Sequence, residues 1–358
     1  MSPIVQSAIT IVIFVVMLGA LVVIHELGHF VTARLAGVRV LEFGIGFPPR
    51  AKVLRSEGET LYTLNWLPIG GFVRLEGEDG ESEDPRSFVR ASLPKKVIIL
   101  IAGVLMNLAL AFAIFFAISA VANPTWVLTI DEVQTGSPAA VAGLAVGDQV
   151  ASLNGTPFDG FGNPGVTLRD HAGETVQLGI VRADGTPTTV DARLRSQADI
   201  TITSGALGIK FQPSIAYAQN PPGEAVRMGI ARTSEALTLI WNGLGQLADS
   251  VVNRPTEPPP VAGPIGIASQ VGDVFWQLGA VYTLYLAGIL SANLALVNIL
   301  PFPPLDGGRI AILLLKAVAG ERVSVRAERL TYFVGFVCLM AFLAWISFFD
   351  ITAPGRGQ

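Results

Sequence analysis

The segment AITIVIFVVMLGALVVIHELGHF, residues 8–30, joins an uncharged apolar run to three ionisable residues. No charged side chain occurs between Ala8 and Ile24, and the apolar character continues past the histidines to Ala36. Because about 20 apolar residues cross the hydrocarbon core of a bilayer, this run predicts a membrane-spanning helix. The N-terminal residues contain no Lys or Arg, unlike the start of a cleaved signal peptide, so we expect the span to be retained.

The composition of the chain is that of a membrane protein. Of its 358 residues, 51% are hydrophobic and 15% are charged, and the mean hydropathy is +0.55. The net charge of −4 provides no basic excess, so no nucleic-acid partner is expected. Cys338 is the only cysteine, which excludes a disulfide within the chain, and its place in an apolar run predicts a packed thiol.

Four apolar blocks predict four membrane spans. They are about Ile9–Leu35, about Val97–Ala122, a block from near Phe275 that breaks at Pro301–Pro304, and about Thr331–Phe349. Basic residues gather in the connection 37–96 and in the connection before the last block, whereas the N-terminal tail has none. The positive-inside rule therefore places both basic connections in the cytoplasm, with the N-terminus and the segment 123–274 outside.

The outside segment has the pattern of a small β-rich domain. Residues 127–213 alternate short apolar runs with Gly, Asn and Asp turns. The stretch GSPAAVAGLAVGDQVASLNGTPF, residues 136–158, resembles a PDZ domain, a fold that binds extended peptides as an added strand. A β-rich spacer that binds nothing is the alternative.

An amphipathic helix and a linker are expected after this domain. Apolar residues recur at helical spacing through 221–252, which indicates a helix lying at the outer membrane face or the packed face of a soluble helix. The sequence NRPTEPPP, residues 253–260, then predicts a proline-rich linker.

The ionisable residues of the first span form an H-E-x-x-H pattern. On a helix, His25 and His29 are one turn apart and share a face, and Glu26 flanks the same space. The pattern supplies two zinc ligands and a carboxylate that can act on a bound water. Three ionisable residues satisfied only by neighbouring helices would cost several kcal/mol in a membrane span, which favours the metal hypothesis.

A catalytic zinc needs a third protein ligand and one open position. The remaining histidine, His171, falls in the outside domain, so we expect a carboxylate from another span. Asp306 in NLALVNILPFPPLDGGRI, residues 293–310, is the candidate. The prolines before it prevent a continuous helix, and irregular backbone at membrane depth is tolerated where it lines a cavity. Simple capping of the following helix by Asp306 is the alternative.

Together these motifs resemble the site-2 proteases, a family of intramembrane zinc metalloproteases. The resemblance rests on HELGH (25–29), NILPFPPLDGG (298–308) and the PDZ-like domain between them, and covers nearly the whole chain. Two smaller matches, IAGVLMN (101–107) and AGPIGIA (262–268), agree with it.

The resemblance implies a role for each motif residue. His25, His29 and Asp306 would bind zinc, and Glu26 would be the general acid/base. The residues implied to contact substrate are Asn298, Pro301, Pro303, Gly44 and Gly46.

A hairpin is implied between the first two spans. EFGIGFPPR (42–50) and YTLNWLPIGGFVRL (62–75) resemble the membrane-associated β hairpin that engages substrate as a strand. An alignment shifted by two residues would place Pro48 on the second glycine of its Gly-x-Gly motif.

The fold expected is an α-helical polytopic membrane protein of about four transmembrane helices, with an inserted β-rich PDZ-like extracytoplasmic domain and a membrane-associated β hairpin. The expected segments are the HELGH span 1–36, the cytoplasmic-side hairpin region 37–96, the second span 97–122, the PDZ-like domain 123–213, the amphipathic helix and linker 214–274, the third span with the LDG motif 275–318, and the final span 319–358.

The function expected from the resemblance is hydrolysis of peptide bonds within transmembrane segments, in a bacterial inner membrane. The expected partners are membrane lipid and single-span membrane proteins, such as anti-sigma factors or remnant signal peptides, with a peptide or C-terminus at the PDZ-like domain. That domain would filter bulky substrates or capture trimmed ones. Asn298 would bond to unwound substrate backbone or, alternatively, to another helix.

Two rival functions belong to other classes. A non-catalytic membrane adaptor would use the PDZ-like domain and keep HELGH as a relic. A metal transporter would need polar residues across the first span, and Ala8–Ile24 offers few.

Overall fold

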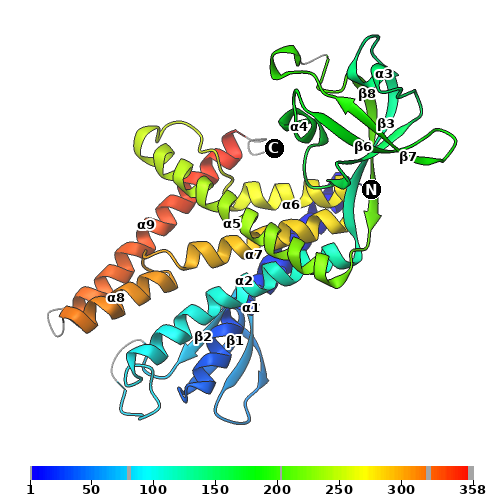
Figure 1. The fold of residues 1–358 in the computed structure, drawn as a ribbon. Helices are drawn as coiled ribbons and strands as arrows, with labels where there is room; N and C mark the ends of the chain where they lie inside the picture. Colours follow the sequence, from blue (N-terminus) through cyan, green and yellow to red (C-terminus); the bar gives the residue numbers. More distant parts are fainter. Residues whose placement is uncertain (1, 79–81, 202–203, 320–323, 354–358) are drawn as a thin grey trace. The chain divides into compact units, whose positions relative to one another are not determined.

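The computed structural model describes residues 2–78, 82–201, 204–319 and 324–353. Four described helices are long and apolar enough to cross a membrane (Figure 1). They are α1 (Pro3–Leu35), α2 (Leu93–Val121), α7 (Ala280–Asn298) and α9 (Val325–Thr352). The prediction of four spans is confirmed, and the protein is a membrane protein.

The connection between α1 and α2 forms the antiparallel hairpin expected from the sequence. Strands β1 (Val40–Arg55) and β2 (Leu61–Leu75) pair in a register that sets Ile45 opposite Gly71. The hairpin lies against α1 mainly through β2. A small core of buried apolar side chains joins the hairpin, α1 and α2. Its buried members are Phe30, Ala33, Val38, Val40, Leu75, Phe88, Ile99 and Leu100.

The third apolar block is divided differently from the prediction. Phe275 was expected to begin the third span, but it belongs to a separate helix, α6 (Pro264–Leu278). Gly279 ends α6 and precedes α7 with φ at +86°, a backbone conformation that favours glycine. The short apolar piece after the prolines is also a helix of its own, α8 (Asp306–Ala319). The expected span 275–318 therefore comprises parts of three helices.

Two helices outside the four spans pack closely against them. Helix α5 (Pro222–Asn253) places Ala236 and Ile240 against Phe115 of α2 and Tyr285 of α7. Both carboxylate oxygens of Asp350, near the end of α9, accept hydrogen bonds from the first turn of α6. The bonds come from the backbone N–H groups of Gly263, at 3.0 Å, and Gly266, at 2.9 Å.

The cysteine of α9 differs from its prediction. Cys338 is exposed rather than packed, because its side of α9 is not covered by the described residues.

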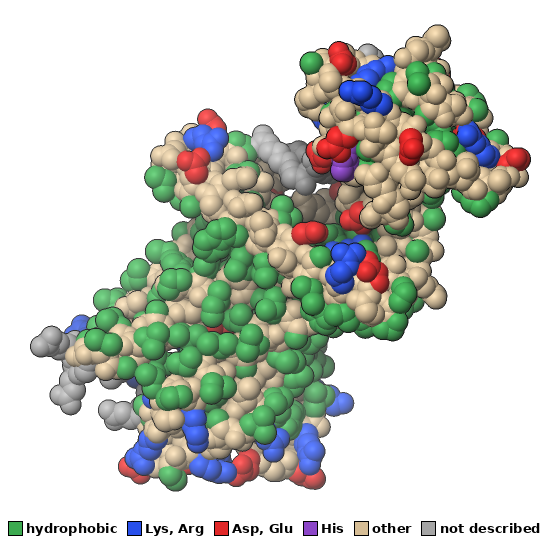
Figure 2. Space-filling view, viewed as in Figure 1, with side chains coloured by type: hydrophobic (Ala, Val, Ile, Leu, Met, Phe, Trp, Pro, Cys, Tyr) green, Lys and Arg blue, Asp and Glu red, His purple; other side chains and the backbone are tan. Residues whose placement is uncertain are grey.

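The first compact unit, residues 1–116 with 226–358, has an apolar exterior. Hydrophobic side chains cover its helices in Figure 2, while Lys and Arg gather around the hairpin and the start of α2. The exposed basic residues there include Arg50, Lys52, Arg55 and Lys95. This distribution is that of a membrane protein with a basic rim at one end.

The second unit, residues 117–225, is built on a six-stranded antiparallel sheet in the order β7-β6-β4-β5-β3-β8. Its strands are β3 (Asn123–Val133), β4 (Gln149–Leu153), β5 (Thr156–Asp159), β6 (Thr175–Val181), β7 (Pro187–Arg193) and β8 (Ile209–Ala218). Short helices α3 (Pro138–Val141) and α4 (Pro164–Asp170) and a 3-10 turn (Gln197–Asp199) complete it. The β-rich domain predicted from the turn pattern is confirmed. Its core includes Leu128, Val150, Leu178 and Ile180.

Candidate metal centre

Helix α1 carries two buried histidines on one face. His25 and His29 are 6% and 8% exposed, and their Nε2 atoms lie 3.1 Å apart. Glu26 is half-buried beside them. The one-turn spacing therefore brings the two imidazoles to a common point, as the sequence predicted.

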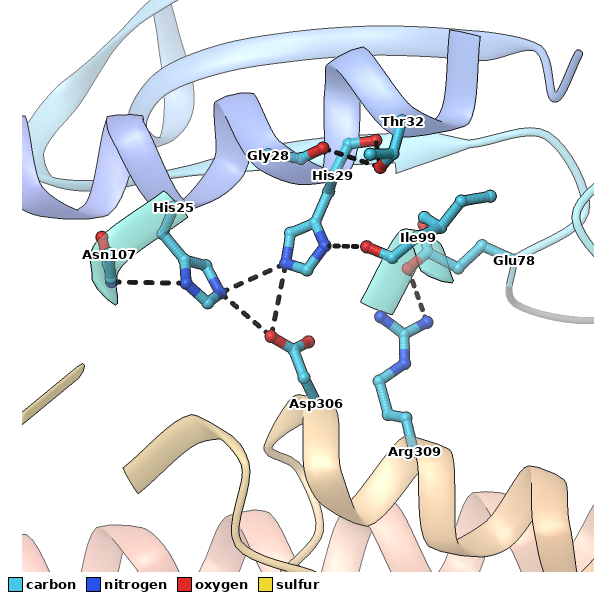
Figure 3. Close-up of polar contacts among 9 residues, drawn as sticks. All are labelled: His25, Gly28, His29, Thr32, Glu78, Ile99, Asn107, Asp306 and Arg309. Atoms are coloured by element: carbon cyan, nitrogen blue, oxygen red, sulfur yellow. Dashed lines mark hydrogen bonds and ion pairs between the residues drawn. The ribbon is translucent and has the colours of Figure 1, made fainter. Parts of the chain in front are cut away.

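Asp306 reaches the same point from the first turn of α8. Its Oδ2 atom lies 2.9 Å from Nε2 of His25 and 3.3 Å from Nε2 of His29 (Figure 3). The chain before α8 folds back tightly to place this residue: a Cβ on Gly307 would lie 2.1 Å from the carbonyl oxygen of Ile299. Glycine at 307 is what permits this close return.

The three ligand atoms fit a zinc ion. Ligands at about 2.0–2.2 Å around a tetrahedral zinc lie about 3.3 Å from one another. The separations of 2.9, 3.1 and 3.3 Å among His25, His29 and Asp306 match that triangle. Two imidazoles and one carboxylate are also ligands that zinc accepts at catalytic sites. These three residues form the candidate metal group.

Helix α2 supplies the next layer of contacts. Nδ1 of His29 lies 2.8 Å from the backbone oxygen of Ile99, so the ring donates there and leaves Nε2 for a ligand. Asn107 lies beside the other imidazole, with its Nδ2 atom 3.4 Å from Nδ1 of His25. Ile99 and Asn107 lie two turns apart on one face of α2.

A cavity of about 190 Å³ opens onto the candidate metal group. It is lined by Val22, His25, Glu26, Asn107, Leu294, Asn298, Pro304, Leu305 and Asp306. Of the five residues that the resemblance implies contact substrate, Asn298, the last residue of α7, is the one that lines this cavity. Pro301 and Pro303 lie outside the lining, and their neighbours Pro304 and Leu305 take that place.

The hairpin approaches the candidate metal group at Gly71, a residue to which the resemblance assigns no role. A Cβ on Gly71 of β2 would lie 3.6 Å from Cγ of Glu26 and 3.0 Å from the backbone oxygen of Gly44. Gly44 and Gly46 are not among the residues that line the cavity. Gly46 adopts φ at +79° within β1.

An ion pair ties α8 to the chain that follows the hairpin. Nη2 of Arg309 lies 2.5 Å from Oε1 of Glu78 (Figure 3), and both side chains are largely buried. The other carboxylate oxygen of Glu78 accepts a hydrogen bond from the backbone N–H of Leu75 at the end of β2. Arg309 is one turn from Asp306, so the pair anchors the turn that carries the third candidate ligand.

Other features lie in the second unit. His171 bonds to Glu174 at 2.8 Å. A larger hollow of about 430 Å³ lies between α3 and the end of β7, but none of the candidate ligands line it.

A membrane protein with H-E-x-x-H on one helix and a carboxylate completing the ligand set from another has the make-up of a membrane metalloprotease. The comparisons with known proteins agree. The chain matches Peptidase family M50 over residues 13–342. The chain belongs to this family, the site-2 proteases, and is a zinc metalloprotease, which confirms the resemblance inferred from its motifs.

Relatives match the chain over most of their lengths. A Clostridium acetobutylicum protein whose name includes the words "zinc metalloprotease" is 30% identical over 351 residues, 98% of this chain and 99% of its own. The zinc metalloprotease RasP of Geobacillus kaustophilus is 28% identical over 427 residues, 97% of this chain and 99% of its own. A Synechocystis relative, similarly named, is 30% identical over 344 residues, 90% of this chain and 89% of its own.

The sequence analysis noted IAGVLMN (101–107) of α2 as a smaller match but assigned its residues no role, and it missed the pair between Glu78 and Arg309. One signal was present: Asn107 is a carboxamide within an apolar span, where polar residues are costly and frequently functional. Glu78 and Arg309 are 231 residues apart, and no local pattern connects them.

Proposed function

We propose that His25, His29 and Asp306 hold the zinc ion and that the protein hydrolyses peptide bonds within transmembrane segments of single-span membrane proteins. The observation that supports this proposal most is the triangle of three ligand atoms, each within 3.3 Å of the others, contributed by a membrane span and by a helix far along the chain. Zinc bound there would supply a Lewis acid that polarises the scissile carbonyl and lowers the pKa of water toward 7.

Glu26 is the proposed general base and acid. It follows His25 directly, is half-buried and lines the same cavity as the candidate ligands. A carboxylate in this position takes the proton of the attacking water and passes it to the leaving amine. Because His25 and His29 are buried and Asp306 is largely buried, charge interactions between Glu26 and a bound zinc would be stronger than in bulk water.

The residues around the cavity suggest how a substrate is held. A transmembrane helix satisfies its own backbone hydrogen bonds, so local unwinding exposes groups that need new partners. Asn298 offers a carboxamide on the cavity wall, and β2 approaches Glu26 at Gly71. We propose that Asn298 and the hairpin together receive the unwound segment, with Pro301 and Pro303 shaping the chain between α7 and α8.

The proposed location is a bacterial inner membrane with the metal centre toward the cytoplasm. The basic side chains around the hairpin support this orientation, because cytoplasmic loops are enriched in Lys and Arg. The same rule supports placing the proposed domain at 123–213 outside the membrane. Anti-sigma factors or remnant signal peptides are the proposed substrate classes.

The β-rich unit is proposed to be a PDZ-like domain that selects substrates. The order of a short helix, a Gly-Asp turn and strand β4 supports this assignment. Deleting residues 127–213 separates two roles. Cleavage of an untrimmed substrate by the deletion variant supports a filter, whereas loss of cleavage of a trimmed substrate supports capture.

Metal analysis of the purified protein is the experiment that tests the assignment of the ligands. The wild type should contain one zinc per chain, and His25→Ala and Asp306→Ala should contain far less. His171→Ala is the matched control, because this partly exposed histidine lies in the second unit, bonds to Glu174 and should leave zinc content unchanged. Equal zinc in Asp306→Ala and wild type would refute the assignment.

Activity tests distinguish the protease from a non-catalytic adaptor. Glu26→Gln should retain zinc and fail to cleave a single-span reporter substrate. An adaptor would keep its cellular function in this variant.

A further inference from the structure

The side chain of Asn107 is placed against a candidate ligand and is incompletely bonded. Asn107 is 0% exposed, and its Nδ2 atom lies 3.4 Å from Nδ1 of His25 (Figure 3). Its Oδ1 atom has no hydrogen-bond partner among the described residues. A buried carboxamide oxygen without a partner costs about 1–3 kcal/mol, which calls for an explanation at this position.

A neutral imidazole that binds a metal through Nε2 carries its proton on Nδ1 and needs an acceptor for it. For His29, the backbone oxygen of Ile99 is that acceptor, at 2.8 Å. For His25, the group that contacts Nδ1 is the carboxamide of Asn107. With Nδ2 toward the ring, two donors would face each other once Nε2 is a ligand.

A half-turn of the carboxamide resolves both problems. The oxygen and nitrogen of an Asn side chain are nearly the same size, so rotation about its last bond exchanges them within the same space. The rotated oxygen faces Nδ1–H of His25, and the group that lacked a partner gains one.

The geometry of α2 explains why both acceptors come from this helix. Ile99, Gly103 and Asn107 recur every four residues and so share one face. Helix carbonyls point toward the C-terminus, whereas side chains lean toward the N-terminus. The carbonyl of Ile99 and the side chain of Asn107 therefore converge on the level of Gly103, where the two histidines lie.

We infer that Asn107 is a positioning residue that accepts the Nδ1–H hydrogen bond of His25 through Oδ1 and holds that imidazole with Nε2 toward the metal. This inference rests on the proposed role of His25 as a zinc ligand. The pair His25–Asn107 is then the counterpart of His29–Ile99, and α2 orients both histidines of α1.

Zinc affinity of three variants, measured by chelator competition on the full chain, tests this role. Asn107→Leu keeps the volume but removes the acceptor, and we expect its affinity to fall by about 10–100-fold, as for other groups that orient a ligand. Asn107→Asp keeps an acceptor and cannot donate, so it should stay within about threefold of wild type or bind more tightly. The optical spectrum of the Co²⁺-substituted protein should change in Asn107→Leu and return toward wild type in Asn107→Asp.

Ser291→Ala is the matched control. Ser291 donates to the backbone oxygen of Asn107 at 2.7 Å, so this change disturbs the same contact between α2 and α7 without touching the carboxamide. It should leave zinc affinity unchanged.

Two outcomes would overturn the inference. Asn107→Leu could bind zinc as tightly as wild type, or Asn107→Asp could fold and lose as much affinity as Asn107→Leu, which would make the amide a donor. If Asn107→Asp does not fold, the comparison of Asn107→Leu with Ser291→Ala still decides whether the carboxamide matters. Failure of the ligand assignment itself is distinguishable, because wild type and every variant would then share the zinc content of His25→Ala.

Discussion

Gly103 of α2 lies directly against His29 of α1. A Cβ added to Gly103 would lie 2.5 Å from Nε2 of His29 and 2.7 Å from Cε1 of His25. Any side chain at this position would therefore occupy the space beside a candidate ligand atom. The backbone of α2 forms one wall of the candidate metal centre, and the absence of a side chain at residue 103 makes that approach possible.

Gly103→Ala should weaken zinc binding strongly without lowering the helix content of α2. Alanine favours a helix over glycine by up to about 1 kcal/mol, so the local structure of α2 should not suffer. The methyl group would displace His29, and we expect zinc affinity to fall by about 100-fold or more, beyond the loss of a single orienting contact. Chelator competition measures the affinity, and circular dichroism checks the helix content.

Gly245→Ala on α5 is the control for this prediction. A Cβ there would meet no atom within 4 Å, and Gly245 also lies inside a helix. Normal zinc affinity in this variant and weak affinity in Gly103→Ala would assign the effect to the histidines. Tight zinc binding by Gly103→Ala would contradict the proposed position of the metal.

The pair of Glu78 and Arg309 should hold Asp306 in place. Arg309→Gln leaves a largely buried carboxylate without its cation, which should lower the free energy of unfolding by about 1–3 kcal/mol. Because Asp306 is one turn away, zinc affinity should fall as well. Thermal unfolding and chelator competition measure the two effects.

An exposed pair provides the comparison. Arg86 and Glu59 lie 2.7 Å apart with side chains 48% and 61% exposed. Arg86→Gln should have little effect on the free energy of unfolding, because solvent screens an exposed ion pair, and should leave zinc affinity unaffected. The double variant Glu78→Arg with Arg309→Glu should recover part of the lost zinc affinity. If its zinc affinity is no higher than that of either single variant, the two residues do not act as a direct pair.

The sequence predicts those parts of the fold that follow from local patterns. Runs of about 20 apolar residues identify the four spans, and turn residues at short intervals identify the β-rich unit. The break at Gly279 was missed because apolar residues continue on both sides of it. Only the positive φ of that one residue separates α6 from α7.

The candidate site was likewise predictable only where local sequence patterns determine it. The spacing of His25 and His29 fixes their common face, and the need for a third ligand led to Asp306. Which residues line the cavity could not be deduced from the sequence at the level of single residues. The chain turns back between Ile299 and Gly307, and this return decides that Pro304 rather than Pro303 faces the cavity.

Glu42 should contribute to the stability of the hairpin at neutral pH. Its side chain is 2% exposed and accepts bonds from Arg50, at 2.9 and 2.6 Å, and from Thr63, at 2.9 Å. Burial alone would raise the pKa of Glu42, but the hydrogen bonds from Arg50 and Thr63 and the charges of Arg50 and Arg74 lower it. Glu42→Gln should reduce the free energy of unfolding by about 1–3 kcal/mol at pH 7.

The lowered pKa of Glu42 also sets the direction of the pH dependence. The folded state holds this carboxylate ionised, so its contribution is present above the ordinary pKa of 4.5 and is lost as the pH falls below that value. The stability difference between wild type and Glu42→Gln should therefore shrink below about pH 4.5. Glu57→Gln, in the exposed turn of the hairpin, is the control and should show little difference at any pH. A constant gap between wild type and Glu42→Gln from pH 7 to pH 3 would contradict this prediction.

Asn298 should affect cleavage without affecting the metal. It lines the cavity with Glu26 and Asp306 but is not one of the candidate ligands. Asn298→Leu removes the proposed hydrogen bond to the unwound substrate backbone, and such a bond contributes about 0.5–1.5 kcal/mol, so kcat/KM should fall by up to about tenfold. Zinc content should equal that of wild type. Pro301→Ala, which changes a residue outside the cavity lining, should have the smaller effect on cleavage. If Asn298→Leu loses zinc, Asn298 supports the packing of α7 instead of holding substrate. If Pro301→Ala impairs cleavage more strongly than Asn298→Leu, the segment after Asn298 makes the contact with substrate.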